Sequence, residues 1–145
     1  MNKKPPTVYF ARGVDDLVVA DVIAKGKRIA ARLAKAGVQT VDPVAELAAH
    51  SRTLSAADIV EYDLDRLRRA DAVFMDMSVG NRNYVGCCCE LVYAYQWRIP
   101  VVVYVGRSGN ERRHWLQYHA TGVHTSYRAS IAQLLAELAK INNGE

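Results

Sequence analysis

Residues 99–105 read IPVVVYV, the most strongly apolar strand-like run in the chain. Its apolar residues do not alternate with polar ones, which indicates a β-strand that is buried on both faces. Such strands belong to parallel sheets that are covered by helices on each side. The run therefore predicts an α/β fold.

Short β-prone runs alternate with helical patterns along the rest of the chain. Strands are expected at residues 7–11, 38–41, 71–77, 99–105 and 123–127. Helices are expected at residues 15–36, 44–50, 55–70, 86–97, 112–119 and 129–141. The alternation predicts one doubly wound, mainly parallel five-stranded sheet of Rossmann or flavodoxin-like type, in strand order 2-1-3-4-5, with helices on both faces.

Capping signals mark the ends of two of these helices. Asp15 or Asp16 is expected to cap the first helix, and Gly37 lies just past its end. Ser55 opens a later helix, and Asp58 three residues on completes a capping pair.

The composition is that of a folded protein with one core: 145 residues, 50% hydrophobic and 23% charged. We expect a catalytic domain at residues 7–141, a flexible N-terminal tail at 1–6 and a C-terminal tail at 142–145. No apolar run approaches the roughly 18 residues of a membrane span, and the start lacks the apolar stretch of a signal peptide. We therefore expect a cytoplasmic protein that does not bind membranes.

The formal net charge is +4, but Lys and Arg are spread along the chain with only short clusters. The aromatic interleaving that stacks nucleic-acid bases is missing, so we expect no nucleic-acid partner. A modest positive field suits a small anionic substrate. Cysteine and histidine spacing predicts no metal site, and the three adjacent cysteines at 87–89 are expected to be reduced and mostly packed.

The predicted sheet order locates a ligand site. In open parallel sheets, ligands bind outside the carboxyl ends of the strands, where neighbouring connections leave in opposite directions. For this order the crevice lies between the strands at 7–11 and 71–77. Residues 9–15 and 78–90 then face it.

Glu90 is the first candidate for chemistry. It lies near the start of the helix expected at 86–97, where the positive end of the helix dipole favours the ionised form that a nucleophile needs. The plain alternative is a solvated helix glutamate. Its position beside the predicted crevice favours the catalytic interpretation.

Asp63 is the second candidate carboxylate. It shares one helix face with Leu67, whereas Asp65 is turned away from that face. A carboxylate on an inward face must be paired, ligand-bound or catalytic. The alternative is a surface ion pair with Arg66 or Arg68.

Arg12-Gly13, directly after the first strand, is typical of a phosphate-binding turn. Glycine lets the backbone approach closely, arginine supplies a fork of donors, and the next helix offers free N–H groups. Ser78 and Asn83 add donors on the opposite wall, although such residues are more often plain turn residues. The absence of a G-x-G-x-x-G motif argues against a dinucleotide fold.

Several pieces of sequence then form an ordered set that covers most of residues 7–105. They are Val8-Tyr9-Phe10-Ala11, Asp63-Leu64, Ala70-Asp71-Ala72-Val73, GCCCE at 86–90, Tyr93-Ala94 and Ile99-Pro100-Val101-Val102. The set resembles the nucleoside 2-deoxyribosyltransferase-like superfamily, including its small nucleoside 5'-monophosphate N-glycosidases. The string FARG at 10–13 is most similar to the CMP and hydroxymethyl-CMP hydrolases.

The resemblance implies roles for individual residues. Glu90 attacks C1' of the sugar to form a glycosyl-enzyme intermediate, and Asp63 is the assisting carboxylate near the base and sugar. Tyr9 and Phe10 form the pocket wall. Gly86 opens the substrate-binding turn before the nucleophile.

A departure from the transferases bears on the substrate. They carry an acidic residue six positions before the nucleophile, and this chain has Tyr84 there. An acid would repel a phosphate, so its replacement favours a 5'-phosphate substrate. The phosphate contacts are expected to be Arg12, Gly13, Ser78 and Asn83.

We therefore expect hydrolysis of the N-glycosidic bond of a CMP-like pyrimidine nucleoside 5'-monophosphate to free base and (deoxy)ribose 5-phosphate, without a metal or other cofactor. The resemblance also implies a homodimer or larger homo-oligomer with a shared active site, formed through residues 114–124. One alternative is a deoxyribosyltransferase that exchanges bases. Another is a nucleotide-binding module without turnover.

Overall fold

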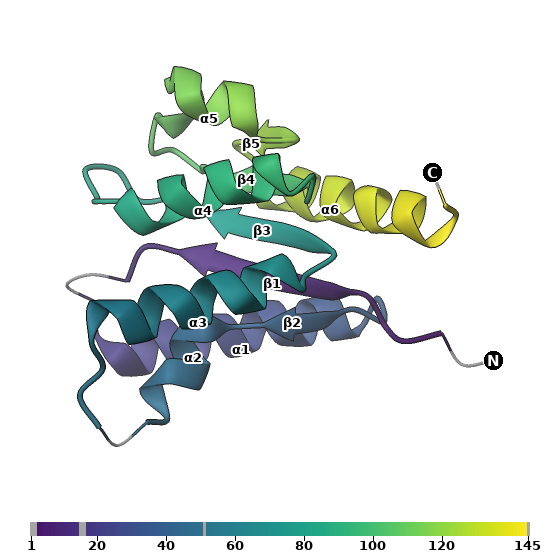
Figure 1. Ribbon diagram of the computed structural model, residues 1–145. Helices are drawn as coiled ribbons and strands as arrows, with labels where there is room; N and C mark the ends of the chain where they lie inside the picture. The colour runs from purple at the N-terminus through teal and green to yellow at the C-terminus, as the bar shows by residue number, and fades with distance from the viewer. Residues whose placement is uncertain (1–2, 15–16, 51, 145) are drawn as a thin grey trace.

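The computed structural model describes residues 3–14, 17–50 and 52–144 and contains one five-stranded sheet (Figure 1). The strands are β1 (Thr7–Arg12), β2 (Gln39–Val41), β3 (Ala72–Asp76), β4 (Val101–Tyr104) and β5 (Gly122–His124). Their order is β2-β1-β3-β4-β5, and all four neighbouring pairs are parallel. The predicted α/β class and strand order are confirmed.

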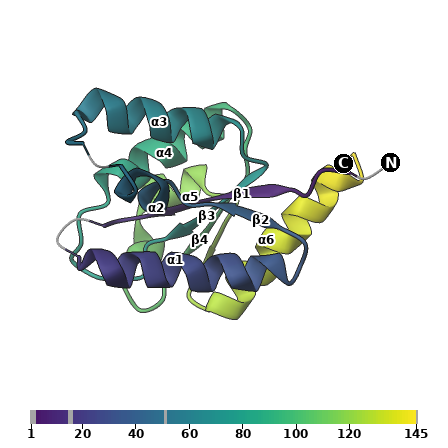
Figure 2. The same ribbon diagram turned by 90° about the horizontal axis from the view of Figure 1, so that it is seen from below.

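Helices cover both faces of the sheet. They are α1 (Val19–Ala34), α2 (Pro43–Ala48), α3 (Ala56–Arg68), α4 (Val85–Gln96), α5 (His114–His119) and α6 (Tyr127–Asn142), with a 3-10 turn at Asn110–Arg112. Figure 2 shows α1 and α6 on one side of the sheet and α3 and α4 on the other. This is the doubly wound arrangement that alternating strands and helices predict.

Strand alternation divides the apolar interior into two cores. In β1, Val8 and Phe10 pack with α1 and α6, whereas Tyr9 and Ala11 face α3 and α4. In β4, residues 101–103 are fully buried and supply both cores. The IPVVVYV run is therefore buried on both faces as predicted, although the strand itself starts at Val101.

Several helix ends differ from their expected positions. Helix α1 begins at Val19 after an N-cap, Val18, that makes no side-chain cap hydrogen bond, and the predicted caps Asp15 and Asp16 lie outside the described residues. Helix α2 begins at Pro43, one residue earlier than expected, because Asp42 caps it and proline suits the first helical turn. Helix α6 begins at Tyr127 instead of 129, with Ser126 as its cap.

Two predicted helix signals are confirmed. Ser55 and Asp58 form a reciprocal capping box: the Asp58 N–H donates to Ser55 Oγ (3.1 Å) and the Ser55 N–H donates to Asp58 Oδ2 (3.0 Å). Gly37 adopts a φ of +75° just after α1, a conformation that favours glycine.

A buried ion pair joins the first strand to the second β-α connection. Arg12 Nη2 donates to both carboxylate oxygens of Asp42, at 3.0 and 2.8 Å, and the Arg12 side chain is only 5% exposed. Gly26 of α1 lies directly over the pair. A Cβ at Gly26 would approach Asp42 Oδ2 more closely than real Cβ contacts do.

Gly26→Ala is expected to destabilise the protein by about 1–3 kcal/mol, because the new methyl group must displace the Arg12–Asp42 pair. Alanine normally stabilises a helix relative to glycine by up to about 1 kcal/mol. Gly86→Ala is the matched control, since a Cβ at Gly86 meets nothing within 4 Å. Urea unfolding measures both variants, and a Gly26→Ala protein at least as stable as the parent would contradict the expectation.

Candidate active site

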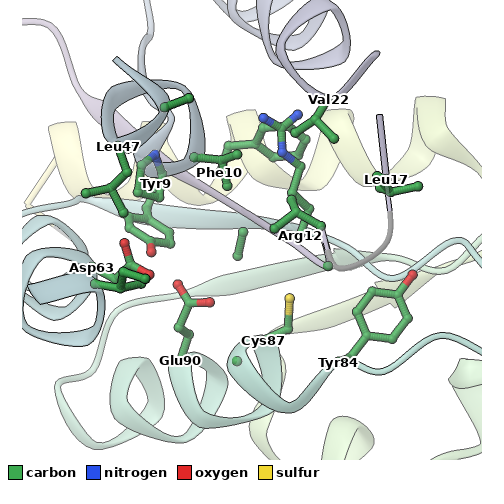
Figure 3. Close-up of a pocket in the computed structure, with 18 of the residues that line it drawn as sticks. Tyr9, Phe10, Arg12, Leu17, Val22, Leu47, Asp63, Tyr84, Cys87 and Glu90 are labelled. Atoms are coloured by element: carbon green, nitrogen blue, oxygen red, sulfur yellow. The ribbon is translucent and has the colours of Figure 1, made fainter. Parts of the chain in front are cut away.

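A cavity of about 480 Å³ lies beside the carboxyl end of β1 (Figure 3). Its wall combines β1 and the segment after it, the start of α1, α2, α3 and the first two turns of α4. Its position at the β1–β3 switch point agrees with the crevice predicted from the strand order.

Three ionisable oxygens meet inside this cavity. Tyr9 comes from β1, Asp63 from α3 and Glu90 from the second turn of α4, and Figure 3 shows their polar ends pointing toward one another. Among the described residues, the Tyr9 hydroxyl, Asp63 Oδ1 and Glu90 Oε2 are buried without a hydrogen-bond partner. Buried polar atoms in proteins are nearly always paired, so the cluster is typical of a site that a ligand completes.

Burial controls the protonation of both carboxylates. Desolvation raises the pKa of Glu90 to about 7; the Tyr9 hydroxyl opposes that rise, and the charge of Asp63 adds to it. Desolvation also raises the pKa of Asp63 to about 6. The pKa of the Tyr9 hydroxyl is raised by burial and then by Glu90, so it stays protonated.

Burial outweighs the helix dipole that was expected to favour an ionised Glu90. Glu90 is the sixth residue of α4, and the dipole effect fades beyond the first turn, whereas burial acts on the whole carboxylate. A pKa near neutrality leaves both forms of Glu90 populated at pH 7.

The surface ion pair considered for Asp63 does not form. Arg66 instead donates to Glu46, with Nη2–Oε1 at 2.6 Å, and the Arg68 guanidinium lies over the Trp97 ring. Asp65 is exposed and pairs with Arg69, as its predicted outward position requires. Asp63 is thus the inward carboxylate of α3.

Tyr9 and Phe10 have different surroundings, although both line the cavity. Tyr9 belongs to the core beneath α3 and α4, where its hydroxyl reaches the carboxylates. The Phe10 ring points to the opposite core, where it stacks on Phe74 and lies 4.5 Å below the Arg12 guanidinium. Successive strand side chains point to opposite faces, so the two rings lie on opposite sides of the sheet although both residues line the cavity.

The predicted phosphate contacts are mostly engaged with other groups. Arg12 is neutralised by Asp42. The Ser78 hydroxyl donates to Asp76 Oδ1 at 2.5 Å, and the Asn83 side chain accepts from the Val85 N–H at 2.9 Å. The Ser78 hydroxyl is therefore not a free donor. Arg12 keeps Nε and Nη1 without a hydrogen-bond partner among the described residues, and Asn83 uses only its acceptor oxygen in the bond to Val85.

Backbone groups at the start of α4 remain available to an anion. Gly86 and Cys87 in its first turn line the cavity, and Tyr84, the N-cap, makes no side-chain cap hydrogen bond. The Tyr84 ring packs against Gly13, and its hydroxyl accepts from the Val79 N–H at 3.1 Å. Tyr84 and Gly13 thus close this end of the cavity.

Sequence reasoning missed the apolar side of the cavity. It is formed by α2 and the start of α3, with the lining side chains Pro43, Val44, Leu47, Ala48, Leu54 and Ile59. The apolar pattern of these residues gave the only available signal. It resembles ordinary core packing, so it did not identify a binding surface.

The three cysteines are free thiols as predicted, but the predicted packing holds for one of them. Cys87 is buried and lines the cavity, and burial raises the pKa of its thiol. Cys88 and Cys89 are exposed. Successive helix residues are turned by about 100° from one another, so three adjacent residues cannot all face the core.

Two further classes of feature are absent from residues 3–14, 17–50 and 52–144. No helix there has the length and apolar character needed to cross a membrane. No three His, Cys, Asp or Glu side chains there come together as a metal site.

Solved structures share this architecture. The 2-desoxiribosyltransferase of Leishmania mexicana is 21% identical, with a TM-score of 0.69 over 91% of this chain and 98% of its own. A 2-deoxyribosyltransferase from Bacillus psychrosaccharolyticus is 17% identical, with a TM-score of 0.66 over 85% and 88% of the two chains. The CMP N-glycosidase of Clostridium botulinum is 12% identical, with a TM-score of 0.58 over 88% and 96%. These likenesses establish the fold.

No curated protein sequence matches the chain. The family model described as nucleoside 2-deoxyribosyltransferase matches residues 8–133, which include the Tyr9, Asp63 and Glu90 cluster. This match spans most of the 145 residues. The chain therefore belongs to the nucleoside 2-deoxyribosyltransferase family.

Proposed function

We propose that the protein hydrolyses the N-glycosidic bond of a pyrimidine nucleoside 5'-monophosphate of the CMP type. The observation that carries this proposal is the meeting of Tyr9, Asp63 and Glu90 in one cavity, each with a buried oxygen that has no hydrogen-bond partner within the described residues. A glycosyl transfer through a covalent intermediate needs a carboxylate nucleophile and a second group that moves a proton. The cluster supplies both.

In the first step, ionised Glu90 attacks C1' of the sugar, and the bond from C1' to the base nitrogen breaks. The bonding electrons leave with the base, which receives a proton from the protonated fraction of Asp63. In the second step, water attacks C1', the glutamate ester bond breaks, and Asp63 takes the water proton. Tyr9 orients the nucleophile because its hydroxyl stays protonated beside Glu90.

The shape of the cavity supports an orientation for the nucleotide. The apolar side formed by α2 and the start of α3 would hold the base, close to Asp63. The 5'-phosphate would point toward the start of α4, where the first-turn residues Gly86 and Cys87 line the cavity at the positive end of the helix dipole. Tyr84 at the position of the transferases' acidic residue supports a phosphate at this end.

A deoxyribosyltransferase is the second candidate, favoured by the structural likeness to two 2-deoxyribosyltransferases. The two activities share the first step and differ in the second, where a new base replaces water. The measurement that distinguishes them is therefore whether the sugar is released free or is joined to the second base.

The first test incubates the protein with nucleosides and 5'-monophosphates, with and without a second free base, and follows the products by chromatography. We expect release of base from a monophosphate and no exchange. Glu90→Gln should lower kcat by at least about 10³-fold, since the amide cannot attack C1'. Base release that persists in Glu90→Gln would remove the mechanism.

The same variant has a stability readout that checks its folding. The pKa of Glu90 is raised in the folded protein to about 7 from an ordinary 4.5, so ionisation destabilises the fold as pH rises between these values. Glu90→Gln should thus be more stable than the parent above pH 7, by up to about 3 kcal/mol. The difference should vanish below about pH 4.5.

The second test is the pH dependence of kcat/KM. The active form has Glu90 ionised and Asp63 protonated, so kcat/KM should follow a bell-shaped curve against pH. Its two flanks should lie near the pKa values of about 6 and about 7, which describe the two carboxylates as a coupled pair. Asp63→Asn should leave only the rising flank and move it to lower pH, because the Asp63 charge no longer raises the pKa of Glu90. A profile that remains bell-shaped in Asp63→Asn would exclude Asp63 as the proton donor.

We also propose that the protein is a homodimer formed through α5 and the adjoining face of α4. Trp115 and Tyr118 of α5 are 75% and 69% exposed, and the Tyr118 ring contacts the exposed Tyr95 of α4. Exposed aromatic clusters of this kind mark protein–protein contacts.

The dimer is tested by sedimentation equilibrium of the parent and of Trp115→Ser/Tyr118→Ser. We expect the parent to be a dimer. The double variant should dissociate into monomers at higher protein concentration than the parent does, because it loses the aromatic contact area. The exposed Ile141→Ser on α6 is the control and should leave the mass unchanged. A monomeric parent would refute the proposal.

A further inference from the structure

Helix α2 depends on its neighbours for its position. It has six residues, and an isolated helix of that length is unstable in water. One anchor is its N-cap, Asp42, which pairs with the buried Arg12 of β1. The other is Glu46, which contacts α3. Because α2 supplies part of the apolar side of the catalytic cavity, these two anchors determine where that side lies.

Glu46 joins α2 to two side chains of α3. Arg66 donates to both of its carboxylate oxygens, from Nη2 to Oε1 at 2.6 Å and from Nε to Oε2 at 3.0 Å. The Tyr62 hydroxyl donates to Oε2 as well. A bidentate arginine–carboxylate pair fixes orientation as well as distance. We call Glu46, Tyr62 and Arg66 the α2 clamp.

The α2 clamp holds Glu46 in its ionised form. Burial alone would raise the pKa of Glu46, but the hydrogen bonds from Arg66 and Tyr62 outweigh it and lower that pKa. The Glu46 and Arg66 side chains are 30% and 34% exposed, which places the pair at the solvent edge of the α2–α3 contact. The clamp therefore stays intact at neutral pH and closes that edge.

Asp63 lies on the inner side of the same contact. It follows Tyr62 directly and precedes Arg66 by three residues of α3. Glu46 is likewise next to Leu47, and Figure 3 shows Leu47 on the side of the cavity where Asp63 lies. Neither Glu46 nor Arg66 lines the cavity. The clamp and the cavity wall are therefore formed by adjacent residues of the same two helices.

Exclusion of water determines the protonation of Asp63. Desolvation raises its pKa to about 6, and its Oδ1 is buried without a hydrogen-bond partner among the described residues. In that part of the chain, the titratable groups that face it are Tyr9 of β1, Glu90 of α4 and Tyr62 of its own helix. Helix α2 presents apolar side chains to the cavity. Water admitted between α2 and α3 would solvate the carboxylate and favour its ionised form.

We propose that Glu46 is a positioning residue for the reaction: through Tyr62 and Arg66 it holds α2 against α3 and keeps water away from Asp63, which can then donate its proton to the departing base. The inference rests on the proposed function, in which Asp63 protonates the base. Glu46 does not line the cavity, so it acts through the geometry of the two helices.

The kinetic test breaks the clamp from opposite helices, with Glu46→Ala and with Arg66→Ala. In either variant we expect the acid flank of the kcat/KM profile to move from about 6 to lower pH, by about one pH unit, because water reaches Asp63. The maximum of kcat/KM should fall about tenfold, since a smaller fraction of Asp63 stays protonated while Glu90 is ionised. The alkaline flank near 7 should stay in place.

Arg69→Ala is the matched control, because it breaks the exposed Arg69–Asp65 pair of the same helix. It should leave both flanks and the maximum of kcat/KM at the parent values. Arg66→Lys keeps a cation opposite Glu46 and should restore most of the parent profile. A purely structural role would lower kcat/KM at every pH without moving the acid flank, and that result would overturn the inference.

A carbon-13 NMR titration of the Asp63 carboxyl group, without any ligand, separates this inference from the proposed function. Asp63→Asn assigns the signal. We expect the pKa of Asp63 to fall from about 6 toward the ordinary 3.8 in Glu46→Ala and Arg66→Ala, and to stay near 6 in Arg69→Ala, even if no nucleotide loses its base. An equal Asp63 pKa in the parent and in both clamp variants would overturn the inference. Base release by the parent would then leave the proposed function standing.

Discussion

Desolvation of two carboxylates is the constraint on which the site depends. Asp63 and Glu90 are held in a largely apolar cavity, and in the part of the chain that the structure describes one oxygen of each has no hydrogen-bond partner. Such burial disfavours the charged form and raises the pKa of both groups toward neutrality. A pair poised in this way can exchange protons near pH 7, which ordinary surface carboxylates cannot do.

The rest of the fold makes this unfavourable arrangement possible. Two cores pack against the sheet, and the parallel strands hold Tyr9 on the same face as α3 and α4. The buried Arg12–Asp42 pair ties the end of β1 to α2, whose apolar side chains complete the cavity, and Gly26 leaves room for it. The cost of the unpaired polar atoms in the cluster is therefore offset by extensive packing elsewhere.

The family fold by itself does not select among substrates, since solved structures of this architecture include transferases and an N-glycosidase. What distinguishes this chain is the neighbourhood of the cluster. The Tyr84 ring closes one end of the cavity against Gly13.

The sequence by itself determined the class of the sheet, its strand order, the capping box at Ser55 and the two carboxylates that face the crevice. Each depends on local information: the period of apolar residues, the type of turn residue, or spacing along one helix. Only the tertiary structure decided that Arg12 pairs with Asp42, thirty residues away, that Phe10 turns to the other core, and that α2 completes the cavity. These partners are determined by packing between segments that are distant in the chain, so no local pattern could reveal them. The same packing buries Glu90, and this burial outweighs the helix dipole in setting its pKa.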